Sequence, residues 1–333
     1  MKILENYSLL PNNTFGIDAK CWQFVEVETP QEAAEKLPFI VKSTKPVMVI
    51  GGGSNLLLTK DYDGIVVHSA IKGITISGEF LTAGSGECFD DVVQTAVSLG
   101  YYGMENLSLI PGDVGASAVQ NIGAYGVEAK DIIHSIEAVE LATGKKVTIM
   151  NKECDYDYRQ SRFKKEWKGN FFITKVTYKL STVFTPHTEY GGIRKALEER
   201  GIVEPSAQDV RDTIIAIRNA KLPDPKVLGN GGSFFMNPIV SKEKFEQLLA
   251  EYPTMPHYNI DANNEKIPAG WMIEQCGWKG KALGKAAVHD KQALVLVNLG
   301  GASGSEIVAL CEQVRKDVKE KFGIDIQPEV NIV

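Results

Sequence analysis

The chain has 333 residues, more than the ~250–300 at which a single hydrophobic core stops growing, so two or three domains are expected. Its composition, 44% hydrophobic and 23% charged, excludes wholesale disorder. The 36 Lys and Arg against 42 Asp and Glu give a net charge of −6, without the basic excess typical of nucleic-acid binders. No apolar run approaches the ~18 residues of a membrane span. From the charge balance we expect no nucleic-acid partner, and from the missing apolar run no membrane partner.

The cysteines and the first residues predict a cytoplasmic protein. The five cysteines lie far apart and form no Cys-x-x-Cys pair, which is typical of reduced thiols. Polar residues at Glu5, Asn6 and Ser8 interrupt the region where a signal peptide needs an apolar stretch. The five histidines show no metal-ligand spacing, so no metal site is expected.

The first part of the chain alternates strand patterns with glycine turns. Strands are predicted at 47–50, 56–58, 64–68 and 73–83. Apolar residues from Phe89 to Val97 at i, i+3, i+4, i+7 and i+8 predict a helix that stops at Gly100. Residues 101–130 show no sustained period, which indicates a long, functional loop.

The second part predicts an α+β protein. A hairpin over 132–150 turns at 143–145, and a strand follows at 172–180. Ser206 and Asp209 resemble a capping box for a helix that must end before Pro223, and the segment 221–225 is the clearest domain boundary. Beyond it we expect helices near 241–250 and 269–276, a strand at 293–298, a long helix with a buried stripe from Ile307 to Phe322, and an alternating strand over 324–332.

Two glycine clusters are candidates for a binding site. The strand at 47–50 runs into Gly51-Gly52-Gly53-Ser54-Asn55, where backbone N–H groups can form a nest for a phosphate, although a simple tight turn is the commoner meaning. The segment 111–126 carries so many glycines that an ordinary helix or strand there would be destabilised by up to ~1 kcal/mol for each. Gly51-x-Gly53 and Gly84-x-Gly86 both lack the third glycine of a dinucleotide fingerprint. Together the two clusters favour a large nucleotide cofactor.

An ordered set of motifs resembles one family, UDP-N-acetylenolpyruvoylglucosamine reductase, the FAD enzyme of peptidoglycan precursor synthesis. Each motif is weak alone, but their order along the chain is specific. The Thr188–Gly191 segment resembles the tyrosine loop of the family's first structural type. The motifs are Gly51–Asn55, Pro111–Gly126, Tyr158-Arg159, Lys221–Lys226, Gly231–Phe235, Asn237-Pro238, Ala269–Trp271, Ala287–His289 and Pro328–Val330.

The resemblance implies three domains, two of which form an FAD-binding unit like that of the PCMH or vanillyl-alcohol-oxidase enzymes. Residues 1–70 with 324–333 would form the first FAD-binding subdomain, 71–221 the second, and 222–323 an α+β substrate domain. The implied activity is NADPH-dependent reduction of the enolpyruvyl ether of UDP-N-acetylglucosamine enolpyruvate to UDP-N-acetylmuramate, with non-covalent FAD. A monomer or weak oligomer with only small-molecule partners is expected.

Three residues carry the chemistry that the resemblance implies. Arg159 would grip the substrate carboxylate, since a guanidinium stays charged and binds bidentately; its ordinary alternative is a solvated arginine. Ser233 would protonate the substrate carbon, whereas most serines in such places cap helices. Glu329, kept protonated by burial, would hydrogen-bond the enolate; otherwise it is an exposed glutamate on an edge strand.

The resemblance also assigns binding residues. The cofactor would be bound by Gly51, Gly52, Gly53, Ser54, Asn55, Gly112, Ser117, Gln120, Asn121, Gly123, Tyr125 and Arg218. The substrate would be bound by Tyr158, Tyr190, Lys221, Asn237, Tyr258 and Gln275.

Two positions depart from the family pattern. Met236 stands where a lysine is frequent, so a cationic contact is absent, and Ala118 replaces a frequent proline, which should loosen the glycine loop. Two alternatives stay open: another FAD oxidoreductase of the same fold, and a UDP-sugar-binding protein without redox activity.

Overall fold

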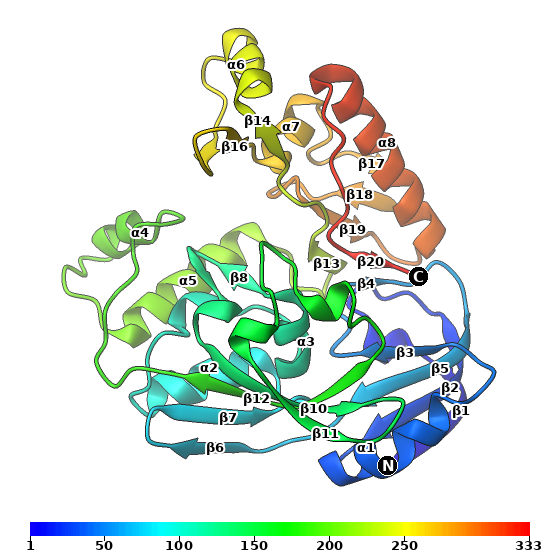
Figure 1. Ribbon diagram of the computed structural model, residues 1–333. Coiled ribbons are helices and arrows are strands. Elements are labelled where there is room, and N and C mark those ends of the chain that lie inside the picture. Colours follow the sequence, from blue (N-terminus) through cyan, green and yellow to red (C-terminus); the bar gives the residue numbers. More distant parts are fainter. The chain divides into compact units, whose positions relative to one another are not determined.

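The computed structural model describes residues 1–333, which form two compact units (Figure 1). Unit 1 contains residues 1–7, 20–53 and 62–220, and unit 2 contains residues 8–19, 54–61 and 221–333. One division between them falls between Ala220 and Lys221. The three-domain boundaries inferred from the sequence remain predictions.

Unit 1 begins with a four-stranded sheet in the order β1-β2-β5-β3. Strand β5 is parallel to both β2 and β3, and helix α1 lies between β2 and β3 in the chain. Thr29 caps α1 by accepting a hydrogen bond from the Glu32 N–H, and Ala33 and Leu37 pack into the core over the sheet. The bounds are β1 Lys2–Ser8, β2 Lys20–Val27, α1 Pro30–Ile40, β3 Val47–Ile50 and β5 Tyr62–Ser69.

A second sheet in unit 1 is antiparallel, in the order β11-β10-β12-β7-β6. The predicted hairpin at 132–150 is confirmed, with Gly144 in its turn at φ +76°. The predicted helix is α2, whose Phe89, Val92 and Val93 are buried against this sheet. The bounds are β6 Ile74–Ser77, β7 Phe80–Gly84, α2 Phe89–Ser98, β10 Ile133–Glu140, β11 Lys146–Met150 and β12 Phe171–Lys179.

The expectation of a long loop over 101–130 was wrong. The segment contains helix α3 (Val114–Gln120) and the short strands β8 (Gly123–Ala124) and β9 (Val127–Glu128). Helix α3 has only seven residues, mostly small, which is too few to show a clear period. Ala118 lies inside this helix, not in a loop, and is fully buried; the loosening expected from the absent proline stays a prediction. A helix interior favours alanine, because proline removes an N–H donor there.

Two further helices complete unit 1: α4 (Ile193–Glu199) and α5 (Ala207–Lys221, whose last residue falls in unit 2). The predicted capping box of α5 is confirmed, since Ser206 and Asp209 exchange hydrogen bonds. Arg211 of α5 binds both carboxylate oxygens of Asp90 on α2, at 2.6 and 3.0 Å. This pair of a buried arginine and a half-buried aspartate joins the two helices. Partial burial alone would raise the pKa of Asp90, but the Arg211 guanidinium and the Leu109 N–H lower it overall.

Unit 2 contains the sheets β13-β19-β18-β17 and β14-β16-β15 and the pair β20-β4. The helices expected near 241–250 and 269–276 are α6 and α7, and the strand expected at 293–298 is β19. The strands are β4 Leu56–Leu57, β13 Gly229–Ser233, β14 Ile239–Ser241, β15 Tyr258–Asn259, β16 Asn264–Lys266, β17 Ala282–Leu283, β18 Ala286–Val288, β19 Val295–Asn298 and β20 Asn331–Ile332. The helices are α6 Lys242–Glu251, α7 Ala269–Gln275 and α8 Gly304–Phe322.

The long helix α8, red-orange in Figure 1, confirms the predicted buried stripe from Ile307 to Phe322. Gly323 ends it in the left-handed conformation at φ +68°. None of the helices combines the length and the apolar composition needed to span a membrane.

The strand expected over 324–332 was largely wrong, because only Asn331–Ile332 (β20) form one. Burial does alternate from Ile324 to Gln327, as the sequence pattern predicted. The carbonyl of Ile326, however, accepts from the Arg315 side chain rather than from a neighbouring strand. The alternation of apolar residues therefore predicted which side chains are buried, but it did not predict strand pairing.

A buried carboxylate in unit 2 gives a testable pH dependence. Glu265 of β16 is 2% exposed and accepts hydrogen bonds from Lys242 (2.8 Å), His257 (3.0 Å) and Asn259 (3.1 Å). The Lys242 ammonium, followed by His257 and Asn259, lowers the pKa of Glu265 to about 2. Ionised Glu265 therefore stabilises the fold above its ordinary pKa of 4.5, and that stabilisation is lost as the pH falls toward about 2.

Glu265→Gln is accordingly expected to lower the urea midpoint at neutral pH. The gap to the wild type should narrow as the pH falls from about 4.5 toward about 2. Urea unfolding at several pH values measures this, with the exposed Glu243→Gln on α6 as the control. A gap that is the same at every pH would contradict the assignment.

Candidate functional site

The two glycine clusters meet in unit 1. A Cβ on Gly51 would lie 2.9 Å from the Ala116 Cβ, and one on Gly52 would lie 3.1 Å from Asp113 Oδ1 and 3.4 Å from the Gly112 Cα. The turn after β3 thus packs directly against the segment that leads into α3. Gly53 and Gly112 have φ of +63° and +116°, a region that glycine adopts without strain.

The glycine turn is expected to tolerate no larger side chain, which can be tested by flavin retention. Gly52→Val should lose bound FAD, since branched methyl groups would extend beyond a Cβ that is already crowded by Asp113. The flavin absorbance of the purified variant after gel filtration measures this. Ala142→Val, at an exposed position in the β10–β11 turn of unit 1 where φ is not positive, is the control. Flavin retained by Gly52→Val would remove this turn from the cofactor site.

Arg218 of α5 lies beside Tyr125, one of the glycine-segment residues. The Arg218 guanidinium lies near enough to the Tyr125 hydroxyl for the two groups to interact electrostatically. Burial raises the pKa of Tyr125 and lowers that of Arg218. The Arg218 Nε is buried and has no hydrogen-bond partner. A buried cation with an unsatisfied donor fits an anionic group such as a diphosphate.

The structure places the rest of the predicted cofactor residues mainly against protein atoms. Ser117 is buried, and its hydroxyl donates to the Val114 carbonyl at 2.7 Å. The Gln120 side-chain oxygen accepts from Lys164 at 2.8 Å. In unit 2, the Asn55 amide donates to the Glu329 carbonyl at 3.3 Å. Ser54 precedes Asn55 in the same unit.

Arg159 lies in unit 1 beside the glycine segment. Its guanidinium donates to the Asn121 carbonyl at 3.3 Å and to the Gly123 carbonyl at 2.6 Å. The guanidinium carbon also lies 5.4 Å from the centre of the Tyr158 ring, a cation–π distance. Tyr190 packs near Gly126, 3.5 Å from the position that a Cβ there would take. Unit 1 therefore brings Arg159, Tyr158 and Gly123 together.

Ser233 and Glu329 lie close together in unit 2. Ser233 ends β13 and is exposed, opposite Val295 of β19. The Glu329 N–H donates to the carbonyl of Phe234 at 2.7 Å, and Phe235 pairs with Pro328. Glu329 is thus held beside the residue that follows Ser233.

The predicted substrate residues of unit 2 have different surroundings. The Asn237 side chain accepts from the Ala269 N–H at 2.9 Å, at the start of α7. The Gln275 carbonyl accepts from Lys321 at 2.6 Å. Tyr258 on β15 is exposed, and Lys221 is the last residue of α5. Their assignment to the substrate remains a prediction.

Sequence reasoning missed several polar residues around these groups. The Asp113 carboxylate lies against Gly52, and its Oδ2 is 3.6 Å from His68 Nε2. Lys164 donates to the Arg159 carbonyl at 2.8 Å as well as to Gln120. The only sequence pattern that pointed to Lys164 is Ser161-x-x-Lys164. This pattern matches a motif of β-lactamases, but the match is weak. In this structure these residues stabilise the chain around Arg159, because the Ser161 hydroxyl donates to the Val119 carbonyl at 2.6 Å.

Comparisons with known proteins identify the family of this chain. Residues 23–150 match the model of an FAD binding domain, and residues 224–333 match the C-terminal domain of UDP-N-acetylenolpyruvoylglucosamine reductase. A protein of that name from Bacteroides fragilis is 53% identical over 99% of both chains.

Solved structures support the fold. The UDP-N-acetylenolpyruvylglucosamine reductase of Thermus caldophilus has a TM-score of 0.69 at 22% identity, covering 99% of this chain and 98% of that one. The 6-hydroxy-D-nicotine oxidase of Arthrobacter nicotinovorans has a TM-score of 0.56 at 13% identity, covering 97% of this chain and 86% of that one. The expected α+β fold with an FAD-binding unit of the oxidase type is therefore confirmed. The chain belongs to the UDP-N-acetylenolpyruvoylglucosamine reductase family, and it is an FAD-dependent oxidoreductase.

Proposed function

We propose that this chain reduces the enolpyruvyl ether of UDP-N-acetylglucosamine enolpyruvate to UDP-N-acetylmuramate, with NADPH as the reductant. In this reaction the methylene carbon gains a hydride, the carbon next to the carboxylate gains a proton, and NADPH leaves as NADP⁺. The observation that carries the proposal is that Ser233 and Glu329 lie on neighbouring segments, which are joined by the hydrogen bond from the Glu329 N–H to the Phe234 carbonyl and by the pairing of Phe235 with Pro328. A proton donor and a carboxyl group are the two functions that this chemistry needs at one carbon.

The cofactor fits the residues present. A Cβ at Gly51 or Gly52 would meet Ala116, Asp113 or Gly112, so these glycines allow the two glycine segments to pack together. Successive small residues of this kind can present backbone N–H groups to a phosphate, and Arg218 offers a buried Nε with no hydrogen-bond partner. Bound FAD supplies the hydride after reduction by NADPH.

The chain's own residues are proposed to manage charge and protons. Arg159 binds the substrate carboxylate, where negative charge accumulates as the hydride arrives. Ser233 donates its hydroxyl proton to the carbon next to that carboxylate. A serine hydroxyl is a weak acid, so the proposal gives Glu329 the task of hydrogen-bonding the enolate and lowering the cost of its charge.

The proposal also covers location and partners. We place the enzyme in the cytoplasm, as a monomer or weak oligomer, with the UDP-sugar and NADPH as its small-molecule partners.

An anaerobic titration tests the proposal in two steps. The purified protein should be yellow, NADPH should bleach its flavin absorbance, and the enolpyruvyl sugar should then restore the absorbance as UDP-N-acetylmuramate forms. Flavin that is bleached by NADPH but not reoxidised by the sugar would favour another FAD oxidoreductase of the same fold. Colourless protein that cannot be reconstituted with FAD, but that binds the sugar, would favour a non-redox binding protein.

A further inference from the structure

The backbone of Arg159 is held in a conformation that arginine rarely adopts. The N–H and carbonyl groups of Asp157 and Gln160 bond to each other, at 3.1 and 3.0 Å, and close a two-residue turn. Arg159 is the second central residue of this turn, with φ +55°. That position favours glycine or asparagine, and a larger side chain there costs about 1–3 kcal/mol unless its surroundings hold it. Something else must therefore hold the turn.

Asn121 contacts this turn at both ends. Its side-chain amide donates to the Asp157 carbonyl at 2.9 Å, and its own backbone carbonyl accepts from the Arg159 guanidinium at 3.3 Å. Asn121 therefore fixes both the first residue of the turn, Asp157, and the position of the Arg159 guanidinium. The neighbouring Gly123 is needed for the same approach, because a Cβ there would lie 2.9 Å from Arg159 Nη1.

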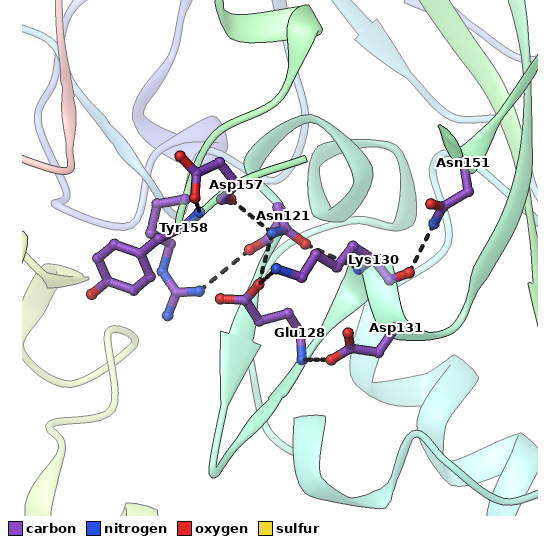
Figure 2. Close-up of polar contacts among 8 residues, drawn as sticks. Asn121, Glu128, Lys130, Asp131, Asn151, Asp157 and Tyr158 are labelled. Carbon is purple, nitrogen blue, oxygen red and sulfur yellow. Dashed lines mark hydrogen bonds and ion pairs between the residues drawn. The ribbon is translucent and has the colours of Figure 1, made fainter. Parts of the chain in front are cut away.

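The side chain of Asn121 is fully engaged by protein groups. Figure 2 shows it between Asp157, Glu128 and Lys130. Its amide also donates to Glu128 Oε2 at 3.1 Å, and its oxygen accepts from the Lys130 N–H at 3.0 Å. Asn121 is 0% exposed, so both amide hydrogens and the oxygen serve contacts inside unit 1.

No other common residue meets these demands. Asn121 ends α3 with φ +48°, a left-handed conformation that asparagine tolerates better than most residues. Aspartate could adopt it, but would lose both donors and face the Glu128 carboxylate. Glycine could adopt it, but would lose the bond to Asp157.

The resemblance assigned Asn121 to the cofactor, but protein groups take all the hydrogen-bonding capacity of its side chain. We infer instead that Asn121 is a positioning residue for Arg159, and that it acts on the reduction of the substrate rather than on the binding of the cofactor. This inference deepens the proposed function and depends on the role given there to Arg159. In this assignment Asn121 contacts neither the substrate nor the reacting carbon. It fixes the position of the Arg159 guanidinium, which binds the substrate carboxylate. Misplacement of a catalytic group by about 1 Å can cost about 10²-fold in rate.

The test is a pair of half-reactions measured on Asn121→Gly and Asn121→Asp. Both variants should keep their flavin and be reduced by NADPH at close to the wild-type rate. Reoxidation by the enolpyruvyl sugar should be slowed about 10²-fold, mainly in kcat. Asn151→Ala is the matched control, because Asn151 binds the Lys130 and Ile133 carbonyls in the same network without touching the Arg159 turn. It should retain near-normal reoxidation.

A double-mutant cycle with Arg159→Lys separates positioning from general loosening. If Asn121 acts through Arg159, the double variant should lose little more than Arg159→Lys alone. Losses that multiply, an equal loss in Asn151→Ala, or loss of bound flavin in both Asn121 variants would overturn the inference. These outcomes are distinct from failure of the proposed function, in which the wild type itself would not be reoxidised by the sugar.

Discussion

Ser233→Ala is expected to slow reoxidation of the flavin by the enolpyruvyl sugar by about 10³-fold, the middle of the range for a lost general acid. Reduction of the flavin by NADPH should continue at close to the wild-type rate, because the serine is assigned only to the proton that reaches the substrate. The fold should be unaffected, since Ser233 is exposed at the end of β13. Stopped-flow absorbance of the two half-reactions measures both effects.

A matched control for that variant is available in the same unit. Ser305→Ala removes another exposed serine hydroxyl, at the start of α8, and should leave both half-reactions unchanged. Loss of both half-reactions to the same extent in Ser233→Ala would remove Ser233 from the protonation step.

Arg159→Lys is expected to lower kcat for the enolpyruvyl sugar by about 10²-fold, although the charge is kept. A guanidinium reaches the Asn121 and Gly123 carbonyls through two different nitrogens and can still present its planar fork to a carboxylate. A lysine ammonium is a single point charge and cannot bind both carbonyls and the substrate carboxylate at the same time. The effect should fall mainly on kcat, since the charge to be stabilised grows as the hydride arrives.

Steady-state kinetics with the purified variant measure this expectation. Arg200→Lys, at the end of α4 in the same unit, is the control for an arginine that serves structure. Near-normal kcat and KM in Arg159→Lys would show that the substrate carboxylate is bound elsewhere.

Elements with a clear hydrophobic period were predictable from the sequence, whereas short elements without such a period were not. Helices α2 and α8 each present a stripe of buried apolar residues at helical spacing, so their period was visible. Helix α3 was missed because glycine and alanine give no contrast between its faces. Burial alternates over 324–327, but the segment before Asn331 does not form a strand, since side chains and isolated bonds take its carbonyls.

The sequence suggested which residues form the candidate site, and that set stays a prediction, but it did not indicate how they are arranged. The resemblance pointed to Arg159, Ser233 and Glu329 by their motifs. Nothing in the sequence indicated that Asn121 would bind the turn of Arg159, because the two lie 38 positions apart and meet only through backbone carbonyls. Contacts to backbone carbonyls depend on the path of the chain through its turns, and the pattern of side chains in the sequence does not predict that path.

The division of the chain bears on how the protein would respond to a protease. The polypeptide crosses from one unit to the other after residues 7, 19, 53, 61 and 220, which makes five crossings. A single cut in the proline-containing segment at 221–225 would sever only one of these connections. The nicked fragments would stay joined, because β4 from the N-terminal fragment is paired with β20 from the C-terminal fragment. Unit 2 accordingly cannot be excised as one continuous piece of chain.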